Sequence, residues 1–450
     1  MKNNVKNESV VSNGGKKMGF VWKLILGELL IAYLSLNSYS TVYGQVKIKK
    51  MTYEQFIKTN VPQKTELDIF LKNKGTWAQF SPEFGYILGN SMPHDGRDSS
   101  FTISTVQANG ARTQVNYKDM PCRINVYGDS FAQCHQVSDG ETWEEILAAN
   151  FGEPIRNFGM GGYGTYQSYR RLLKEESTVD RAKNIIFYIW GDDHQRSLLP
   201  CRYMAIKAWN DKMAPGYSFH GNFWPYLDFD LETGKFTEHN NKLNTPQLLY
   251  RMMDQDWMYE NLKDNLGLQA LLFIQGYTTD FDNNKMLQLA RWMNIDLNMN
   301  DKANLAKNME ILLDKFGYAA NIYILERLKE FALKNDKNLL IVIFDPYKTM
   351  RALILDQPRV DQEMVDYLKS HGFNYFDMNI VHAADYKKNN LSLKDYYSTY
   401  FVGHYDPNGN MFFARSIKTK LVNWLNPKPI THLNTDKEYI DFNGYLQGLR

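Results

Sequence analysis

The sequence predicts an α/β fold of three layers, in which helices cover both faces of a five-stranded parallel sheet. Two observations support this prediction. Short apolar runs of strand length alternate with helical patterns over residues 121–200 and again over 318–424. The run at 184–190, Asn-Ile-Ile-Phe-Tyr-Ile-Trp, is apolar almost throughout, as expected for a strand buried on both faces. Strands that alternate with helices form a parallel sheet, because each crossover helix returns the chain to the end of the sheet at which the preceding strand began.

The individual elements follow from apolar spacing and end signals. We expect strands at 123–127, 155–158, 184–190, 339–344 and 374–376. We expect helices at 138–150, 166–176, 318–334, 362–370 and 408–424. Ser138 and Glu141 have the spacing of a capping box, which marks a helix start. Ligands of such sheets lie at the carboxyl ends of the strands, so the loops after 127, 158, 190 and 344 and before 408 are the candidate site.

The remaining segments surround this α/β core of 121–426. Residues 46–120 hold one short helical pattern at 52–59, and otherwise Gly, Ser, Asn and Thr with short alternating runs, which predicts a small β-rich leader region. The alternation stops at about 200–310, where aromatic loops and helical stretches at 247–261 and 284–294 indicate an insertion or cap. Residues 427–450 form a C-terminal tail.

The N-terminus has the pattern of an export signal. An apolar stretch at 18–36 contains Lys23 and Glu28, and two charges make it a poor membrane span. The part at 24–36, in which Glu28 is the one charged residue, has the length of a signal-peptide apolar region, and Val42-Tyr43-Gly44 precedes an acceptable cleavage point. We therefore expect residues 1–45 to be a signal peptide or membrane anchor, and the protein to be periplasmic, secreted or membrane-anchored. An amphipathic or buried helix of a cytosolic protein is the alternative.

Composition excludes several classes of protein. With 52 basic and 50 acidic residues among 450, no wide nucleic-acid-binding surface is expected. The 29 Tyr, 25 Phe and 9 Trp supply apolar area that disordered chains lack. Three cysteines cannot build a disulfide scaffold.

The candidate loops contain groups suited to acyl transfer. Gly128-Asp129-Ser130 ends the first strand, so the serine lies at the top of the sheet beside helix N–H groups. The second strand leads into Asn157-Phe158-Gly159-Met160-Gly161-Gly162, whose glycine order does not fit a dinucleotide fingerprint and favours a tight turn with its amides toward a ligand. The third strand precedes Gly191-Asp192-Asp193-His194, and adjacent residues of this kind rarely bind one metal ion, so we expect neither a metal nor a cofactor.

Together these loops resemble the SGNH (GDSL-type) hydrolase superfamily, which has a flavodoxin-like sheet and four blocks in this order. Here the first block reads Gly-Asp-Ser-Phe and the third Gly-Asp-Asp-His. The resemblance implies that Ser130 is the nucleophile and that His404, followed by Pro407 and Gly409, is the general base. It implies that the Ser130 and Gly162 N–H groups form the oxyanion hole, with Asn157 at the substrate.

The sequence departs from this family pattern at two places. Asp193 stands where the third block has an asparagine, and an ionised carboxylate cannot donate a hydrogen bond to an oxyanion. Either Asp193 stays protonated, or Arg196 or His194 supplies the donor and contacts the substrate. The acid usually found three residues before the histidine is replaced by Phe401. We expect Asp395 to reach His404 if the loop folds back, and a Ser–His dyad without a third member is the alternative. Asp406 before Pro407 is expected to be a helix N-cap.

The resulting expectation is an exported serine hydrolase that deacylates a carbohydrate or a small acyl ester, with no nucleic acid as partner and membrane attachment only through the N-terminus. Two alternatives stay open. An O-acyltransferase acting on an extracellular polysaccharide would use the same acyl-enzyme, with a sugar hydroxyl in place of water. A non-catalytic glycan-binding protein would keep the aromatic segment 217–226 exposed and hold Ser130 and His404 beyond hydrogen-bond reach.

Overall fold

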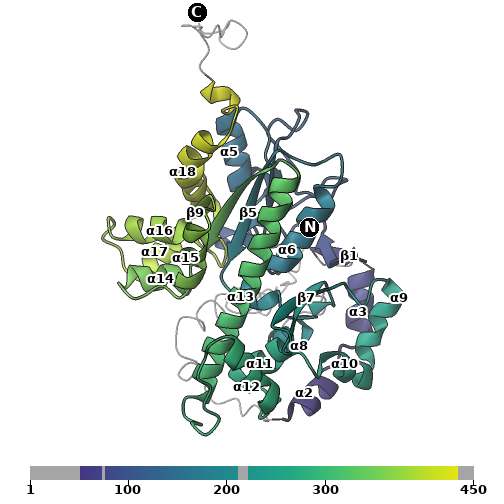
Figure 1. The fold of residues 1–450 in the computed structure, drawn as a ribbon. Coiled ribbons are helices and arrows are strands. Elements are labelled where there is room, and N and C mark those ends of the chain that lie inside the picture. The colour runs from purple at the N-terminus through teal and green to yellow at the C-terminus, as the bar shows by residue number, and fades with distance from the viewer. Residues whose placement is uncertain (1–50, 73–76, 211–220, 434–450) are drawn as a thin grey trace, which may run out of the picture.

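The structure is a computed structural model, which describes residues 51–72, 77–210 and 221–433 (Figure 1). For residues 207–210 it describes only the backbone. The signal or anchor expected at 1–45 therefore lies outside the described residues. Within the described ranges, no helix combines the length and apolar character that a membrane crossing needs.

A five-stranded, entirely parallel sheet lies at the centre of the molecule, which confirms the predicted fold class (Figure 1). Its strand order is β4-β3-β5-β8-β9. The strands are β3 (Ile124–Tyr127), β4 (Arg156–Asn157), β5 (Asn184–Trp190), β8 (Asn338–Phe344) and β9 (Tyr375–Asp377). The central pair, β5 and β8, is in register over seven residues from Asn184↔Asn338 to Trp190↔Phe344.

Alternate side chains of the two central strands, β5 and β8, enter two different cores, as the pleat requires. Phe187 and Ile341 pack in the core with α6 (Thr165–Glu175), α13 (Leu305–Lys334) and α15 (Gln362–Ser370). Tyr188 and Val342 pack in the opposite core, which also contains side chains of α5, α14, α16 and α18. The bounds of these last helices are α5 Trp143–Phe151, α14 Thr349–Ile354, α16 Met378–Tyr386 and α18 Pro407–Trp424.

Helix ends largely follow the capping signals. The Ser138–Glu141 capping box starts a short 3₁₀ turn (Asp139–Glu141), and the Thr142 side chain then accepts the Glu145 N–H to begin α5. The expected helix at 318–334 is longer than predicted: α13 begins at Leu305, because Met309, Leu312, Leu313 and Phe316 extend its buried face toward the insertion.

The leader and the insertion form one unit beside the sheet (Figure 1). The leader contributes α2 (Tyr53–Thr59), α3 (Lys64–Leu71) and a hairpin of β1 (Ala78–Ser81) with β2 (Gly85–Leu88), so it is more helical than the predicted β-rich region. The insertion adds a hairpin and several helices: α8 Tyr203–Asn210, β6 Tyr226–Asp230, β7 Lys235–His239, α9 Pro246–Leu249, α10 Gln255–Leu262, α11 Leu266–Ile274 and α12 Asn283–Trp292. The Tyr53 hydroxyl donates to the Leu262 carbonyl at 2.8 Å, which joins the two segments.

The aromatic segment at 217–226 is buried wherever the structure describes it. Phe223 is 1% exposed, Trp224 is fully buried, and Tyr226 is 6% exposed. The Trp224 indole donates to the Leu199 carbonyl. The described part of this segment thus packs inside the cap and offers no exposed stacking surface.

Candidate active site

Ser130 lies where β3 meets a short helix, α4 (Ser130–Gln133). Asp129 caps this helix, its carboxylate accepting the Phe131 N–H at 2.9 Å. The serine is 9% exposed, and no residue in the described ranges accepts its backbone N–H. The hydroxyl and a free helix N–H are therefore presented together at the carboxyl end of the strand.

His404 contacts the serine from the other end of the chain. Its Nε2 lies 2.8 Å from the Ser130 Oγ, although 274 positions separate the two residues. His404 is held just before α18, whose N-cap is Asp406, with the carboxylate accepting the Gly409 N–H at 2.8 Å. Asp406 is therefore the helix cap that the sequence predicted.

The second imidazole nitrogen of His404 contacts an amide rather than an acid. Its Nδ1 lies 2.9 Å from Gln136 Oε1, which also accepts the His404 backbone N–H. The Gln136 Nε2 donates to the Asp95 carbonyl at 3.0 Å, so the amide orientation is fixed from both ends. Because Oε1 can only accept, Nδ1 carries the proton and Nε2 presents its lone pair to the serine.

The expected role of Asp395 is wrong. Asp395 is exposed in the first turn of α17 (Leu393–Tyr400), and its carboxylate accepts the Ser392 hydroxyl at 2.6 Å. Its backbone N–H donates to the same hydroxyl oxygen, so residue 395 completes a helix start and does not fold back to His404. Gln136 was missed because it lies outside all four blocks and is not acidic.

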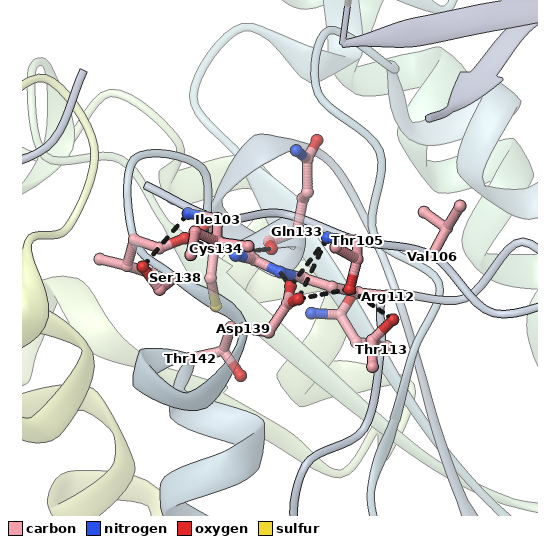
Figure 2. Close-up of polar contacts among 12 residues, drawn as sticks. Ile103, Thr105, Val106, Arg112, Thr113, Gln133, Cys134, Ser138, Asp139 and Thr142 are labelled. Atoms are coloured by element: carbon pink, nitrogen blue, oxygen red, sulfur yellow. Dashed lines mark hydrogen bonds and ion pairs between the residues drawn. The ribbon is translucent and has the colours of Figure 1, made fainter. Parts of the chain in front are cut away.

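A buried arginine of the leader holds the loop that carries Gln136. Arg112 donates to the carbonyls of Gln133 and Cys134 at 2.7 and 2.6 Å and to that of Val137, and it pairs with Asp139 at 2.9 Å (Figure 2). These carbonyls lie at the C-terminal end of α4 and just after it, where no further helical N–H groups are available to bond them. The leader is thus part of the scaffold that positions the imidazole.

The glycine-rich loop packs directly against α4. A side chain at Gly159 would come within 2.2 Å of the Gln133 backbone nitrogen, and Gly162 has a φ of +81°. The Gly161 carbonyl accepts the Tyr86 hydroxyl at 3.0 Å, and in a trans peptide the Gly162 N–H points the opposite way. Among the described residues nothing accepts that N–H, so it is available to a ligand.

Asn157 supports this loop and does not face a substrate. Its side-chain nitrogen donates to the Ala132 carbonyl at 2.8 Å, and its side-chain oxygen accepts the Gly159 N–H at 2.8 Å. It is 4% exposed. The substrate-binding role expected for Asn157 is therefore corrected to one of holding the second loop on α4.

The third loop contains an ion pair where a neutral amide was expected. Asp193 is fully buried, and its two oxygens accept from the Trp190 N–H at 3.0 Å and from Arg196 at 2.9 Å. Arg196 also pairs with Asp192 at 2.5 Å, while its Nε has no partner among the residues that the structure describes. Burial and the nearby Asp129 raise the pKa of Asp193, and the Arg196 guanidinium opposes them. Asp193 thus receives hydrogen bonds and orients Arg196.

His194 points away from the serine. Its Nδ1 lies 3.0 Å from the Gly191 carbonyl oxygen and its Nε2 lies 3.0 Å from Asp314 Oδ1, and its ring stacks on Tyr318 of α13. Both nitrogens are occupied, so the roles expected for His194, as a substrate contact or an oxyanion donor, are not supported. It joins the third loop to the long helix.

The surroundings of His404 favour its neutral form. Burial is the main cause that lowers the pKa of His404 well below 6.5, and the nearby His135 and Arg196 lower it further. Asp95 opposes this and pairs with His135 at 3.3 Å. Within the described ranges, no group of three or more His, Cys, Asp or Glu side chains is arranged to hold a metal ion.

Comparison with known proteins adds nothing to this geometry: no family model and no curated protein matches the chain.

Proposed function

We propose that the protein is a serine hydrolase that cleaves esters through an acyl-enzyme. The observation that carries this proposal is the hydrogen-bonded series Ser130–His404–Gln136, with contacts of 2.8 and 2.9 Å. A serine within reach of a neutral imidazole, itself oriented by a third group, is the arrangement that nucleophilic acyl transfer requires.

In the first half-reaction His404 Nε2 takes the Ser130 proton as Oγ attacks the ester carbonyl. Two groups are suited to hold the resulting oxyanion: the N–H groups of Ser130 and Gly162, which have no acceptor among the described residues. Collapse of the tetrahedral intermediate expels the alkoxide, which takes the proton from His404. Water then repeats the sequence on the acyl-enzyme and releases the acid.

Arg196 takes the place of the third-block amide in this proposal. Its charge is close enough to affect the pKa of His404 and of Asp129, and Asp193 and Asp192 orient it. A fixed cation near a developing oxyanion stabilises the transition state more than the ground state. Asp193 therefore acts through Arg196.

The non-catalytic glycan-binding reading has little support. It required Ser130 and His404 to lie apart, and it required an exposed aromatic segment at 217–226. The two side chains are 2.8 Å apart, and Trp224 is fully buried.

The test is hydrolysis of 4-methylumbelliferyl acetate by the full chain, compared with Ser130→Ala and with Ser177→Ala, an exposed serine on another loop. We expect Ser130→Ala to lose at least about 10³-fold in kcat/KM, and Ser177→Ala to retain activity. Equal activity in all three proteins would refute the proposal. Adding methyl glucoside and detecting acetylated sugar by mass spectrometry reveals acyl transfer, and transfer that exceeds hydrolysis would replace the hydrolase with the acyltransferase.

A further inference from the structure

Arg202 differs from every other buried arginine in the described residues. The four buried arginines there are Arg112, Arg171, Arg196 and Arg202. The first three have a carboxylate within 4.0 Å: Asp139, Glu175, and Asp192 with Asp193. Arg202 is 6% exposed, and no ion pair joins it to any described residue. A buried charge is normally paired, because desolvation without a partner is costly.

The position of Arg202 places this cation beside the proposed oxyanion hole. Its Nη1 donates to the Gly162 carbonyl at 2.9 Å, and the N–H of the same glycine is the free oxyanion donor. Arg196 lies nearby, and burial together with the Arg196 charge lowers the pKa of Arg202 to about 10. Asp192 and Asp193 pair directly with Arg196 and act on Arg202 only from beyond ion-pair distance, so within the described residues Arg202 has capacity for another anion.

An aromatic ring lies against the neighbouring residue of the same loop. The Trp77 side chain is half-buried, and its ring edge lies 2.9 Å from where a Cβ on Gly161 would be. Its ring centroid is 5.7 Å from that of His135, which in turn is 5.0 Å from that of His404. Trp77 thus belongs to a row of rings that leads from the glycine loop to the general base.

We propose that Arg202 and Trp77 form a subsite for an anionic sugar next to the scissile ester, with the guanidinium binding a carboxylate such as that of a uronate unit. A guanidinium fork matches the two oxygens of a carboxylate, and an aromatic ring covers the apolar face of a sugar. This inference rests on the proposed esterase function and names its substrate class: acylated acidic carbohydrates.

The experiment compares a mono-O-acetylated methyl glucuronoside with the matching methyl glucoside, which differ only in carboxylate against hydroxymethyl. For the wild type we expect kcat/KM to be roughly tenfold to a hundredfold higher for the glucuronoside, the worth of one charge-assisted hydrogen-bonded pair. Arg202→Gln should remove this preference, so that within this variant kcat/KM is about the same for the glucuronoside and the glucoside. The 6-phosphate of the glucoside separates the sources of charge: preference for it over the glucuronoside would assign the site to a phosphate and overturn the uronate.

Two controls keep the result interpretable if a variant is destabilised. Arg171→Gln removes a buried arginine that donates to the Gly110 carbonyl and lies over the Phe158 ring, and it should leave the preference intact. Arg202→Lys keeps the charge without the fork and should retain part of the preference. Equal wild-type rates on the two sugars, or an equal fall on both in Arg202→Gln, would overturn the inference and leave Arg202 as a support of the Gly162 carbonyl.

Binding separates this inference from the proposed function. Unacetylated methyl glucuronoside and methyl glucoside are titrated calorimetrically into Ser130→Ala, which cannot form the acyl-enzyme. Tighter binding of the glucuronoside that is lost in Ser130→Ala/Arg202→Gln supports the subsite even if no ester is hydrolysed. Hydrolysis without any difference in binding supports the esterase and refutes the subsite.

Discussion

His404 Nδ1 and Gln136 Oε1 lie 2.9 Å apart, so a neutral amide occupies the place where a triad normally has a carboxylate. An amide fixes the tautomer and the ring orientation as well as a carboxylate does. It lacks the negative charge that stabilises the imidazolium formed during attack. In the proposed mechanism, the orienting role of the third triad member is therefore separated from its electrostatic role.

Substitution of Gln136 tests this separation. Gln136→Ala removes the acceptor of the imidazole N–H and should lower kcat by roughly 10²-fold or more, because both the tautomer and the orientation are lost. Gln136→Glu keeps the acceptor and adds a charge, which should raise the pKa of His404 and move the acid limb of kcat/KM upward by about 1–2 pH units. The pH–rate profiles of both variants provide the measurement.

A third variant serves as a control for the charge that Gln136→Glu adds. Gln288→Glu places the same added charge on an exposed position of α12, far along the chain from the site, and should leave the profile unchanged. If Gln136→Ala retains wild-type kcat, Gln136 does not position His404.

The wild-type pH profile follows from the buried state of His404. Burial, with His135 and Arg196 nearby, lowers the pKa of His404 well below 6.5, so the imidazole remains a competent base below neutral pH. We expect kcat/KM for a small acetyl ester to be constant between pH 8 and about pH 6 and to fall only at lower pH. An acid limb centred near pH 7 would contradict the described surroundings of His404.

Asp193→Asn is expected to lower activity. Both Asp193 oxygens accept hydrogen bonds, and an asparagine would turn an N–H₂ toward either the Trp190 N–H or Arg196. The charged bond to Arg196 is worth about 1.5–3 kcal/mol, so kcat/KM should fall by roughly tenfold or more. Retained or increased kcat/KM would instead indicate that Asp193 is a protonated donor. Asp192→Asn, at the more exposed partner of Arg196, should have a smaller effect.

A second buried histidine makes stability depend on pH. His382 is fully buried between the hydroxyls of Tyr396 and Tyr405, at 3.0 and 2.7 Å, and burial lowers its pKa to about 3. The unfolded chain protonates this imidazole near pH 6.5, so it binds more protons than the folded state between pH 6.5 and pH 3. Stability therefore falls as the pH drops through this window, by an amount on the order of 4–5 kcal/mol at its lower end.

The measurement is urea unfolding of the wild type and of His382→Phe from pH 7 to pH 3. The variant should be less stable at pH 7, because the Tyr405 hydroxyl loses its imidazole partner, but its stability should depend less steeply on pH. Identical pH slopes for the two proteins would show that His382 is not the titrating group.

Much of the fold could be predicted because its signals are local. The run at 184–190 is β5 residue for residue, and 362–370 is α15 likewise, since apolar spacing and flanking polar residues define both. The leader and insertion were less predictable, because they bury their side chains against each other over long distances in the sequence, as Tyr53 and Leu262 do. Such contacts leave no periodic pattern in either segment.

The site residues likewise fall into two groups, those that local sequence marks and those that long-range contacts position. Ser130, His404 and Gly162 lie at strand or helix ends marked by recognisable residues, and the structure brings the first two together. Gln136 follows α4 in a loop whose path is set by Arg112 of the leader, a long-range contact that local sequence does not reveal. Asp395 failed as a candidate because its carboxylate and its N–H both bond Ser392 at the start of a helix, so this segment does not fold back to His404.

The central claim is that Ser130 is a nucleophile activated by His404, and covalent labelling tests it most directly. The full chain is treated with a fluorophosphonate probe, and the adduct is located by mass spectrometry of the digested protein. We predict one adduct on Ser130, its absence in Ser130→Ala, strongly slowed labelling in His404→Ala, and normal labelling in Ser177→Ala. Labelling that persists in Ser130→Ala, or a wild type that is not labelled at all, would contradict the account.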